Sequence, residues 1–215
     1  MTYVTWAALY EGNTDAAYFE VLFPRLMENI VRSRPIGNSD IAAFPAVRLQ
    51  RGEVGKVAQE ACANREAFHL VFIHADTGGR GLQTSIQTRG TSYCEAMQAL
   101  CDWPPDRCIS VLPRQETEAW ILADSMAVTA ALGYRGSPAS VGLPANAGEA
   151  ERLSDPKAVL ASALVQVRGR RRPLDVQQLF PAIAQRQSWD LLREAPSFRA
   201  FEAQLVSALA DLGCI

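Results

Sequence analysis

The chain has 215 residues, of which 48% are hydrophobic and 20% are charged, and its formal net charge is −2. This is enough apolar material for a sizeable buried core in one large domain, which excludes a disordered or low-complexity protein. The near-neutral charge also excludes a strongly basic nucleic-acid coat, although a local basic groove remains compatible with it.

The first residues contain no basic leader, and no apolar stretch approaches the roughly 18 residues that a membrane span needs. We therefore expect a cytoplasmic protein that does not contact a membrane. Its five cysteines are an odd number in a chain large enough to fold without disulfides, which predicts reduced thiols. Cys94, Cys101 and Cys108 recur every seven residues but lack zinc-finger spacing from either histidine, so we expect no zinc site.

Short apolar runs alternate with amphipathic ones in the first part of the chain, as in α/β proteins with a mainly parallel sheet. The run at 69–76 is apolar almost throughout, which fits a strand buried on both faces, and the glycine cluster at 77–81 predicts a loop after it. The expected strands are 3–9, 42–49, 69–76 and 108–112, and the expected helices begin at Asn13 or Thr14, at Glu53 and at Tyr93.

The second part of the chain has mostly helical patterns. Residues 116–132 predict one amphipathic helix, and residues 133–148 predict a connector rich in glycine, proline and serine. Asp155-Pro156-Lys157 predicts a helix start, because proline is tolerated in the first turn. A basic loop at 168–172 and a closing helix at 198–212 follow. We expect a core over 1–132, with a connector and helical extension over 133–215 packed on it.

Acidic residues follow three of the predicted strands. Glu11 comes just after the first strand, Asp76 ends the most buried one, and Glu116 and Glu118 follow the strand at 108–112. Because the carboxyl ends of parallel strands meet at one edge of a sheet, we expect these side chains to converge. Converging carboxylates repel one another unless a cation neutralises them, which predicts a site for Mg²⁺ or Mn²⁺ built from these four residues.

Each acid also has an ordinary structural explanation when it is considered alone. A glutamate and glycine after a strand are common in turns, and Asp76 could cap the turn that follows it. Glu116 and Glu118 suit the first turn of a helix, where the helix dipole favours negative charge. The metal prediction therefore depends on the three segments being close in space.

Taken together, the segments resemble the Toprim domains of topoisomerases, primases and overcoming-lysogenization-defect nucleases. The first strand with Glu11-Gly12-x-x-Asp15-x-x-Tyr18-Phe19 is similar to their first motif, and His74-Ala75-Asp76 lies where they have Asp-x-Asp. Residues 116–124, 155–157 and 197–201 also resemble landmarks of DUF4276 proteins, a Toprim-like bacterial group. The resemblance spans most of the chain. It implies a Toprim-like, Rossmann-like sheet that is mainly parallel and flanked by helices, with a helical C-terminal extension.

The resemblance also implies roles for individual residues. Glu11 would be the general acid and base, and Asp76 would hold Mg²⁺ against a phosphate. The chain departs from the Asp-x-Asp pattern, because His74 occupies the first position, or Gly78 the second if Asp76 is counted first. His74 either binds the metal or hydrogen-bonds locally, and the local role is more frequent. Glu118 is the candidate for the replacement carboxylate.

Positive charge lies near the acids and in the basic loop. Arg80, Arg89 and Arg114 come next to the acidic segments, whereas Arg170, Arg171 and Arg172 could contact a phosphate backbone or simply solvate a loop. The chain lacks a P-loop, since Gly55-Lys56 is followed by Val57. The resemblance implies a separate ATPase subunit as a partner, because nucleases of this type often occur beside ATPases.

A Mg²⁺-dependent Toprim-type nuclease that cleaves DNA or RNA is therefore the leading interpretation, and a role in anti-phage defence is implied by the resemblance alone. As an alternative, the incomplete acidic motif marks a catalytically silent module that binds nucleic acid or a partner protein. Phosphoryl transfer to a small nucleotide is a third interpretation. The sequence leaves open the choice between DNA and RNA and the formation of a homo-oligomer.

Overall fold

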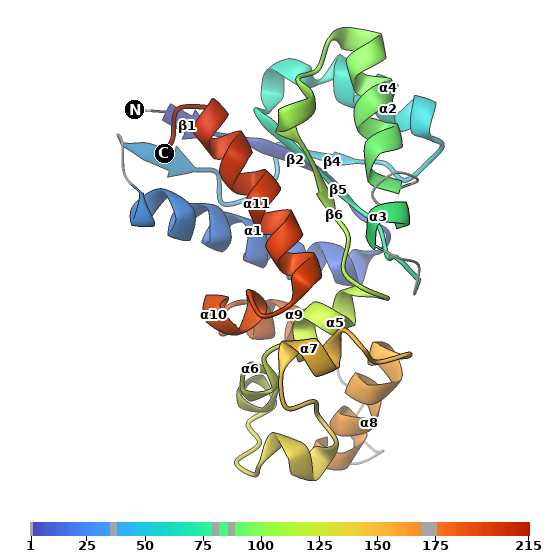
Figure 1. Ribbon diagram of the computed structural model, residues 1–215, viewed down its shortest axis with the longest axis vertical. Helices are drawn as coiled ribbons and strands as arrows, with labels where there is room; N and C mark the ends of the chain where they lie inside the picture. Colours follow the sequence, from blue (N-terminus) through green and yellow to red (C-terminus); the bar gives the residue numbers. More distant parts are fainter. Residues whose placement is uncertain (1, 35–37, 79–81, 86–88, 169–175) are drawn as a thin grey trace.

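The computed structural model describes residues 2–34, 38–78, 82–85, 89–168 and 176–215. At its centre is a four-stranded parallel sheet with the order β4-β2-β5-β6, formed by β2 (Trp6–Leu9), β4 (Val47–Leu49), β5 (Leu70–His74) and β6 (Cys108–Val111). A separate parallel pair joins β1 (Thr2–Val4) to β3 (Ser39–Ile41). The predicted α/β class, with a mainly parallel sheet and C-terminal helices, is confirmed (Figure 1).

Helices cover both faces of the central sheet. Alternate strand residues point to opposite faces, as the two-residue period of a strand requires: Trp6, Ala8 and Phe72 to one face and Ala7, Val71 and Ile73 to the other. The first face packs against α1 (Asn13–Ser33) and α11 (Pro196–Asp211), and the second against α2 (Val54–Ala63) and α4 (Thr91–Cys101) (Figure 1). Burial on both faces explains why these strands are apolar almost throughout.

The C-terminal helix also protects the edge of the sheet. β6 is an edge strand, and its Ser110 N–H donates to Gln204 Oε1 of α11 at 3.1 Å. At the other end of the strand, Arg107 Nε lies 3.1 Å from Asp211 Oδ2. An edge strand exposes unpaired backbone groups that invite pairing with another chain. The closing helix thus contributes to the same core as the amino-terminal strands.

Most of the remaining helices gather at the end of the molecule opposite α2 and α4 (Figure 1). They are α5 (Thr117–Leu122), α6 (Ser125–Ala131), α7 (Ala147–Ala150), α8 (Pro156–Arg168), α9 (Val176–Ala184) and α10 (Trp189–Leu192), whereas α3 (Leu82–Ser85) lies nearer the sheet. α9 packs along α1, and one continuous apolar cluster joins Phe180 of α9 to Trp6 of the sheet. In the described part of the chain, no helix is both long and apolar enough to cross a membrane.

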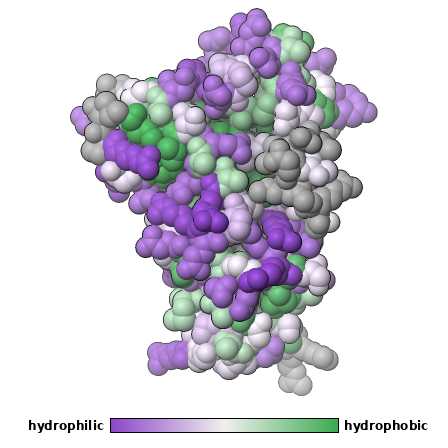
Figure 2. Space-filling view, in the orientation of Figure 1, coloured by the Kyte–Doolittle hydropathy of each residue, from purple (hydrophilic) through white to green (hydrophobic). Residues whose placement is uncertain are grey.

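The visible surface is mainly hydrophilic. Apolar residues on this face form small patches that hydrophilic residues separate (Figure 2). Small separated patches are normal for a protein surface and do not by themselves indicate an interface.

Several predicted elements differ in their bounds. The strand expected at 3–9 is two strands that pair with different neighbours, and only 47–49 of the strand expected at 42–49 is extended within the sheet. The helix expected at 116–132 is broken at Asp124, whose carboxylate accepts the N–H groups of Ala127 and Ser188, each at 2.9 Å. Such N-capping begins a new helix, α6.

Other differences lie in the second half of the chain. Residues 133–148 are partly ordered, with a 3₁₀ turn at Pro138–Val141 and the start of α7. α9 and α10 were not predicted, and Arg168 ends α8 instead of beginning a loop. Three arginines of the expected basic run, Arg170, Arg171 and Arg172, lie outside the described residues, as does Arg80.

The cysteines contradict the expectation of reduced thiols. Disulfides join Cys62 of α2 to Cys101 of α4 and Cys94 of α4 to Cys108 of β6, while Cys214 is free and buried. Residues seven apart on a helix lie on the same side, so Cys94 and Cys101 share the side of α4 that contacts β6 and the neighbouring helix α2. The expectation was wrong because spacing along the chain does not reveal which thiols meet. Disulfides persist mainly in oxidising compartments, so this pairing does not support the cytoplasmic location, which stays a prediction.

The Cys94–Cys108 bond should contribute measurably to stability. Its residues are separated by 14 positions, and closing a loop of that length should stabilise the fold by about 3 kcal/mol. We expect Cys94→Ala with Cys108→Ala to lower the free energy of unfolding by that amount in urea titrations. Cys214→Ala is the control. Because Cys214 is in no disulfide, a reductant should destabilise this variant as much as it destabilises the wild type. A wild-type unfolding curve unchanged by reductant would contradict the pairing.

Candidate active site

The loops after β2, β5 and β6 meet at the carboxyl edge of the sheet, and Thr117 joins them. Its backbone N–H donates to Asp76 Oδ1 at 3.2 Å, and its hydroxyl donates to Asp15 Oδ1 at 2.7 Å. Asp76 follows β5, Asp15 lies in the first turn of α1, and Thr117 begins α5. Thr117 is buried, so these contacts fix the relative position of the three segments.

His74 lies beneath this junction with both ring nitrogens in local contacts. Its Nδ1 accepts the Glu11 backbone N–H at 3.4 Å, and its Nε2 lies 3.1 Å from Thr117 Oγ1 and 3.5 Å from Asp76 Oδ1. Because Nδ1 accepts a hydrogen bond, a neutral imidazole here carries its ring hydrogen on Nε2, where it can donate to Thr117 Oγ1. His74 is 1% exposed. It therefore has the local hydrogen-bonding role and positions the Glu11 backbone.

Two further carboxylates enter from the start of α5. Burial raises the pKa of Glu116 above its ordinary value, and the nearby Asp76 carboxylate raises it further, while Lys157 opposes the shift. Burial raises the pKa of Glu118 to about 7, with the Glu116 and Asp15 carboxylates adding to the rise. In the described structure, Glu116 Oε2 is buried without a hydrogen-bond partner. The acids at the ends of β5 and β6 are thus close enough to repel one another.

The raised pKa of Glu118 predicts a pH-dependent effect on stability. The folded protein holds this proton up to about pH 7, whereas the unfolded chain releases it near 4.5. The free energy of unfolding should therefore fall as the pH rises from about 4.5 to 7, and it should lose no more from this group above about pH 7. Glu118→Gln should raise the melting temperature by a few degrees at pH 8, on the order of 1 kcal/mol, and have little effect at pH 5.

Melting curves of wild type and variant at both pH values test this expectation. Glu66→Gln is the matched control, because the Glu66 side chain is 93% exposed and should change stability little at either pH. An equal gain for Glu118→Gln at pH 5 and pH 8 would show that the carboxylate carries no titration penalty.

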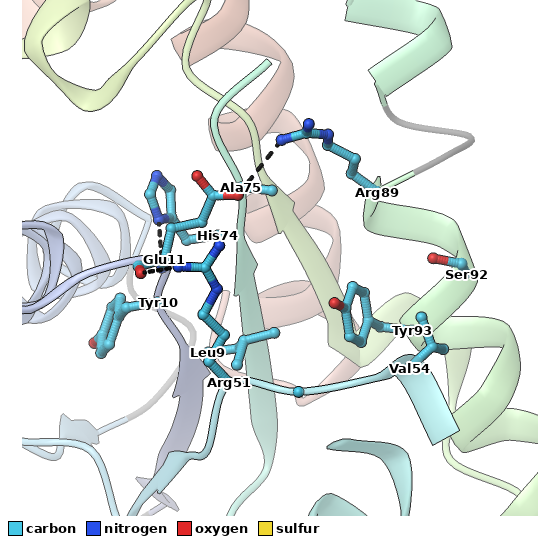
Figure 3. Close-up of a pocket in the computed structure, with 11 residues that line it drawn as sticks. Leu9, Tyr10, Glu11, Arg51, Val54, His74, Ala75, Arg89, Ser92 and Tyr93 are labelled. Carbon is cyan, nitrogen blue, oxygen red and sulfur yellow. Dashed lines mark hydrogen bonds and ion pairs between the residues drawn. The ribbon is translucent and has the colours of Figure 1, made fainter. Parts of the chain in front are cut away.

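Glu11 faces a cavity of about 310 Å³ on the other side of the junction. Its Oε1 lies 3.4 Å from Arg89 Nη1, and that same nitrogen donates to the Asp76 carbonyl. Arg51 Nη1 donates to the Glu11 carbonyl at 3.0 Å. Figure 3 shows the Glu11 side chain between His74 and Arg51, with Arg89 reaching it from the opposite wall. Glu11 is thus an accessible carboxylate held next to two guanidinium groups.

The predicted site residues are therefore only partly brought together. Asp76, Glu116 and Glu118 form a connected acidic group, whereas Glu11 is paired with Arg89. Arg114 is exposed in the turn before α5, and Arg80, Arg170, Arg171 and Arg172 lie outside the described residues. Among the described residues, no three histidine, cysteine or acidic side chains are arranged to hold a metal ion directly.

Sequence reasoning missed four residues of this site. Arg51 carries no motif that would indicate a role. Thr117 and Lys157 lie in the segments 116–124 and 155–157 that contribute to the resemblance, but the resemblance gave neither residue a role. Asp15 belongs to the motif after the first strand, and its spacing of four residues from Glu11 indicates the same helix end. That spacing was the one signal that pointed to it.

Comparisons of the chain with family models, with curated proteins and with solved structures found no match.

Proposed function

We propose that this protein is a Mg²⁺-dependent nuclease that hydrolyses phosphodiester bonds in DNA or RNA. The observation that carries the proposal is the meeting of acids from three separate loops around Thr117, next to the Glu11 and Arg89 pair. Acids of this kind suit hard cations, and arginine suits phosphate. The nucleic-acid substrate, a separate ATPase subunit and an anti-phage role are part of the proposal and derive from the resemblance to Toprim proteins.

The acidic group has the chemistry that magnesium needs. Its donors are carboxylate oxygens. Burial and then the nearby Asp76 carboxylate raise the pKa of Glu116, and Glu116 Oε2 lacks a partner among the described residues. Magnesium is usually held by one or two carboxylates together with water and substrate phosphates, so a complete protein ligand set is not required. Asp76 and Glu116 are the residues we expect to hold it, with Glu118 beside them. The bound cation would offset the charge that builds up on a phosphate during hydrolysis.

Glu11 is the residue we expect to transfer protons. Its side chain is 28% exposed in the cavity, so water and substrate can reach it. Arg89 lies at hydrogen-bonding distance from this carboxylate and is also placed to contact a phosphate oxygen. A general base must lie where it can take a proton from the attacking water, and a carboxylate that faces an open cavity suits that role.

A catalytically silent binding module is the second candidate. It is favoured by the hydrogen bonds and ion pair that already involve Asp15, Asp76 and Glu11, since a site satisfied in this way is stable without a cation. The two candidates predict different responses to magnesium, which makes them separable by experiment.

Thermal melts with and without Mg²⁺ or Mn²⁺ test the metal site. A cation at 100 times its dissociation constant should stabilise the fold by about 2.7 kcal/mol, and Asp76→Asn should abolish the gain. Asp106→Asn is the matched control, because Asp106 is exposed in the turn before β6. Cleavage assays on DNA, RNA and mononucleotides then identify the substrate class. Stabilisation by the cation together with cleavage would support the nuclease proposal, and stabilisation without cleavage would support the metal site alone. The absence of both would refute the nuclease proposal and favour the silent module.

A further inference from the structure

The cavity beside Glu11 has two walls of different chemistry. Glu11 and Arg51 supply charge on one side, and Arg89 extends toward Glu11 from the other side. Tyr93 and Val54 lie across the cavity from Glu11 and Arg51, as Figure 3 shows, and Leu9 lies at its base. A pocket with a charged wall and an aromatic wall suits a ligand that carries a phosphate and a flat ring.

The charged wall suits a phosphate. The planar guanidinium group of arginine can donate two parallel hydrogen bonds to a pair of phosphate oxygens. Two arginines contact Glu11 here: Arg51 donates to its carbonyl, and Arg89 donates to its carboxylate. Arg51 is exposed and Arg89 has a side chain that is 32% exposed, so both can be reached from solvent. Glu11 alone would repel an anion, but the two positive charges outnumber it.

The opposite wall suits a nucleobase. The ring of Tyr93 is half-buried, and Tyr93 lies in the first turn of α4. Stacking on an aromatic ring is the common way in which proteins hold an unpaired base, and it tolerates any base identity. The apolar side chains of Leu9 and Val54 continue this wall.

The size of the cavity limits what it can hold. A volume of about 310 Å³ is at the lower end of the range for small-molecule sites, roughly 300 to 1,000 Å³. It therefore has room for one nucleotide and not for a stretch of duplex. Arg89 contacts both Glu11 and the Asp76 carbonyl, so a nucleotide held here would lie directly beside the acidic group.

We propose that this cavity binds a single phosphate-bearing nucleotide at the end of a strand. The consequence for catalysis rests on the proposed nuclease function: the enzyme acts on chain ends and not within a continuous strand. The site would bind the phosphate through its arginines and stack any base on Tyr93, with little preference among bases.

Titrations in EDTA test the pocket without involving the metal. Adenosine 5′-monophosphate should bind at least about tenfold more tightly than adenosine or inorganic phosphate alone, because it uses both walls. Arg51→Ala and Tyr93→Leu should each weaken its binding at least about tenfold. Arg32→Ala is the matched control, since Arg32 is an exposed arginine near the end of α1 and should leave affinity unchanged. Comparing the affinities of adenosine 5′-monophosphate and adenosine 3′-monophosphate shows whether the pocket prefers a 5′ or a 3′ phosphate end.

Cleavage of one oligonucleotide in linear and circular form tests the consequence. The linear single strand should be degraded with Mg²⁺, and the closed circle should resist. Equal cleavage of both forms, or a monophosphate that binds no better than inorganic phosphate, would overturn the inference. Tight binding of the monophosphate that Arg51→Ala removes would support the pocket even if no substrate is cleaved, and only the nuclease proposal would then fail.

Discussion

Glu11→Gln is expected to slow Mg²⁺-dependent cleavage by about 10²–10⁴-fold, because an amide cannot take up the proton that a general base must accept. The substitution should leave the fold intact. The Glu11 carboxylate lies in an open cavity, its contacts with His74 and Arg51 involve backbone atoms, and the Gln Oε1 can still accept from Arg89. Cleavage rates measured alongside melting temperatures separate a chemical effect from a structural one.

The control for this substitution is Glu28→Gln. Glu28 lies on α1, the helix that follows Glu11, and its carboxylate is paired with Arg32 on the surface. Removing that charge should change neither rate nor melting temperature by much. Undiminished cleavage by a well-folded Glu11→Gln variant would remove Glu11 from the mechanism, and loss of cleavage in both variants would point to an effect of net charge.

The fold could be predicted where burial imposes a period on the sequence. β5 is apolar because helices cover both faces of it, and that run predicted the strand correctly. Glu11, Asp76 and Glu116 lie at the same edge of the sheet because each follows a strand and the strands are parallel. That shared edge could therefore be predicted. Local sequence signals were therefore enough for the sheet and for the elements next to it.

Contacts between distant segments could not be predicted in this way. The break between α5 and α6 depends on Asp124 accepting from Ser188, which is 64 residues away. The pairing of Glu11 with Arg89 and the disulfides depend on how helices α2 and α4 sit on the sheet. Such contacts leave no periodic pattern. Sequence reasoning found the acids and expected Arg89 near them, but it missed Arg51 and the disulfide pairs.

Trp120 connects the core to the acidic group. Its side chain is fully buried and packs against Phe19, Phe198 and Phe201, with ring centroids 5.1 to 5.9 Å apart. Its indole N–H donates to Ser197 Oγ at 2.7 Å. Because Trp120 lies on α5, two residues after Glu118, this packing fixes the helix that carries both Glu116 and Glu118.

We therefore expect Trp120→Ala to lower the free energy of unfolding by about 3–5 kcal/mol, since it removes an indole from a close-packed site. Trp120→Phe should cost less but still destabilise, because the hydrogen bond to Ser197 is lost.

Trp103 is the matched control: it is 7% exposed, and its indole N–H has no partner in the described part of the chain. Trp103→Phe should be nearly neutral, because it removes a buried donor that makes no hydrogen bond. Urea titrations measure the free energy of unfolding of all three variants, provided that the dependence on urea concentration is the same in each. An equal loss of stability in the two Trp→Phe variants would contradict the role assigned to the Ser197 contact.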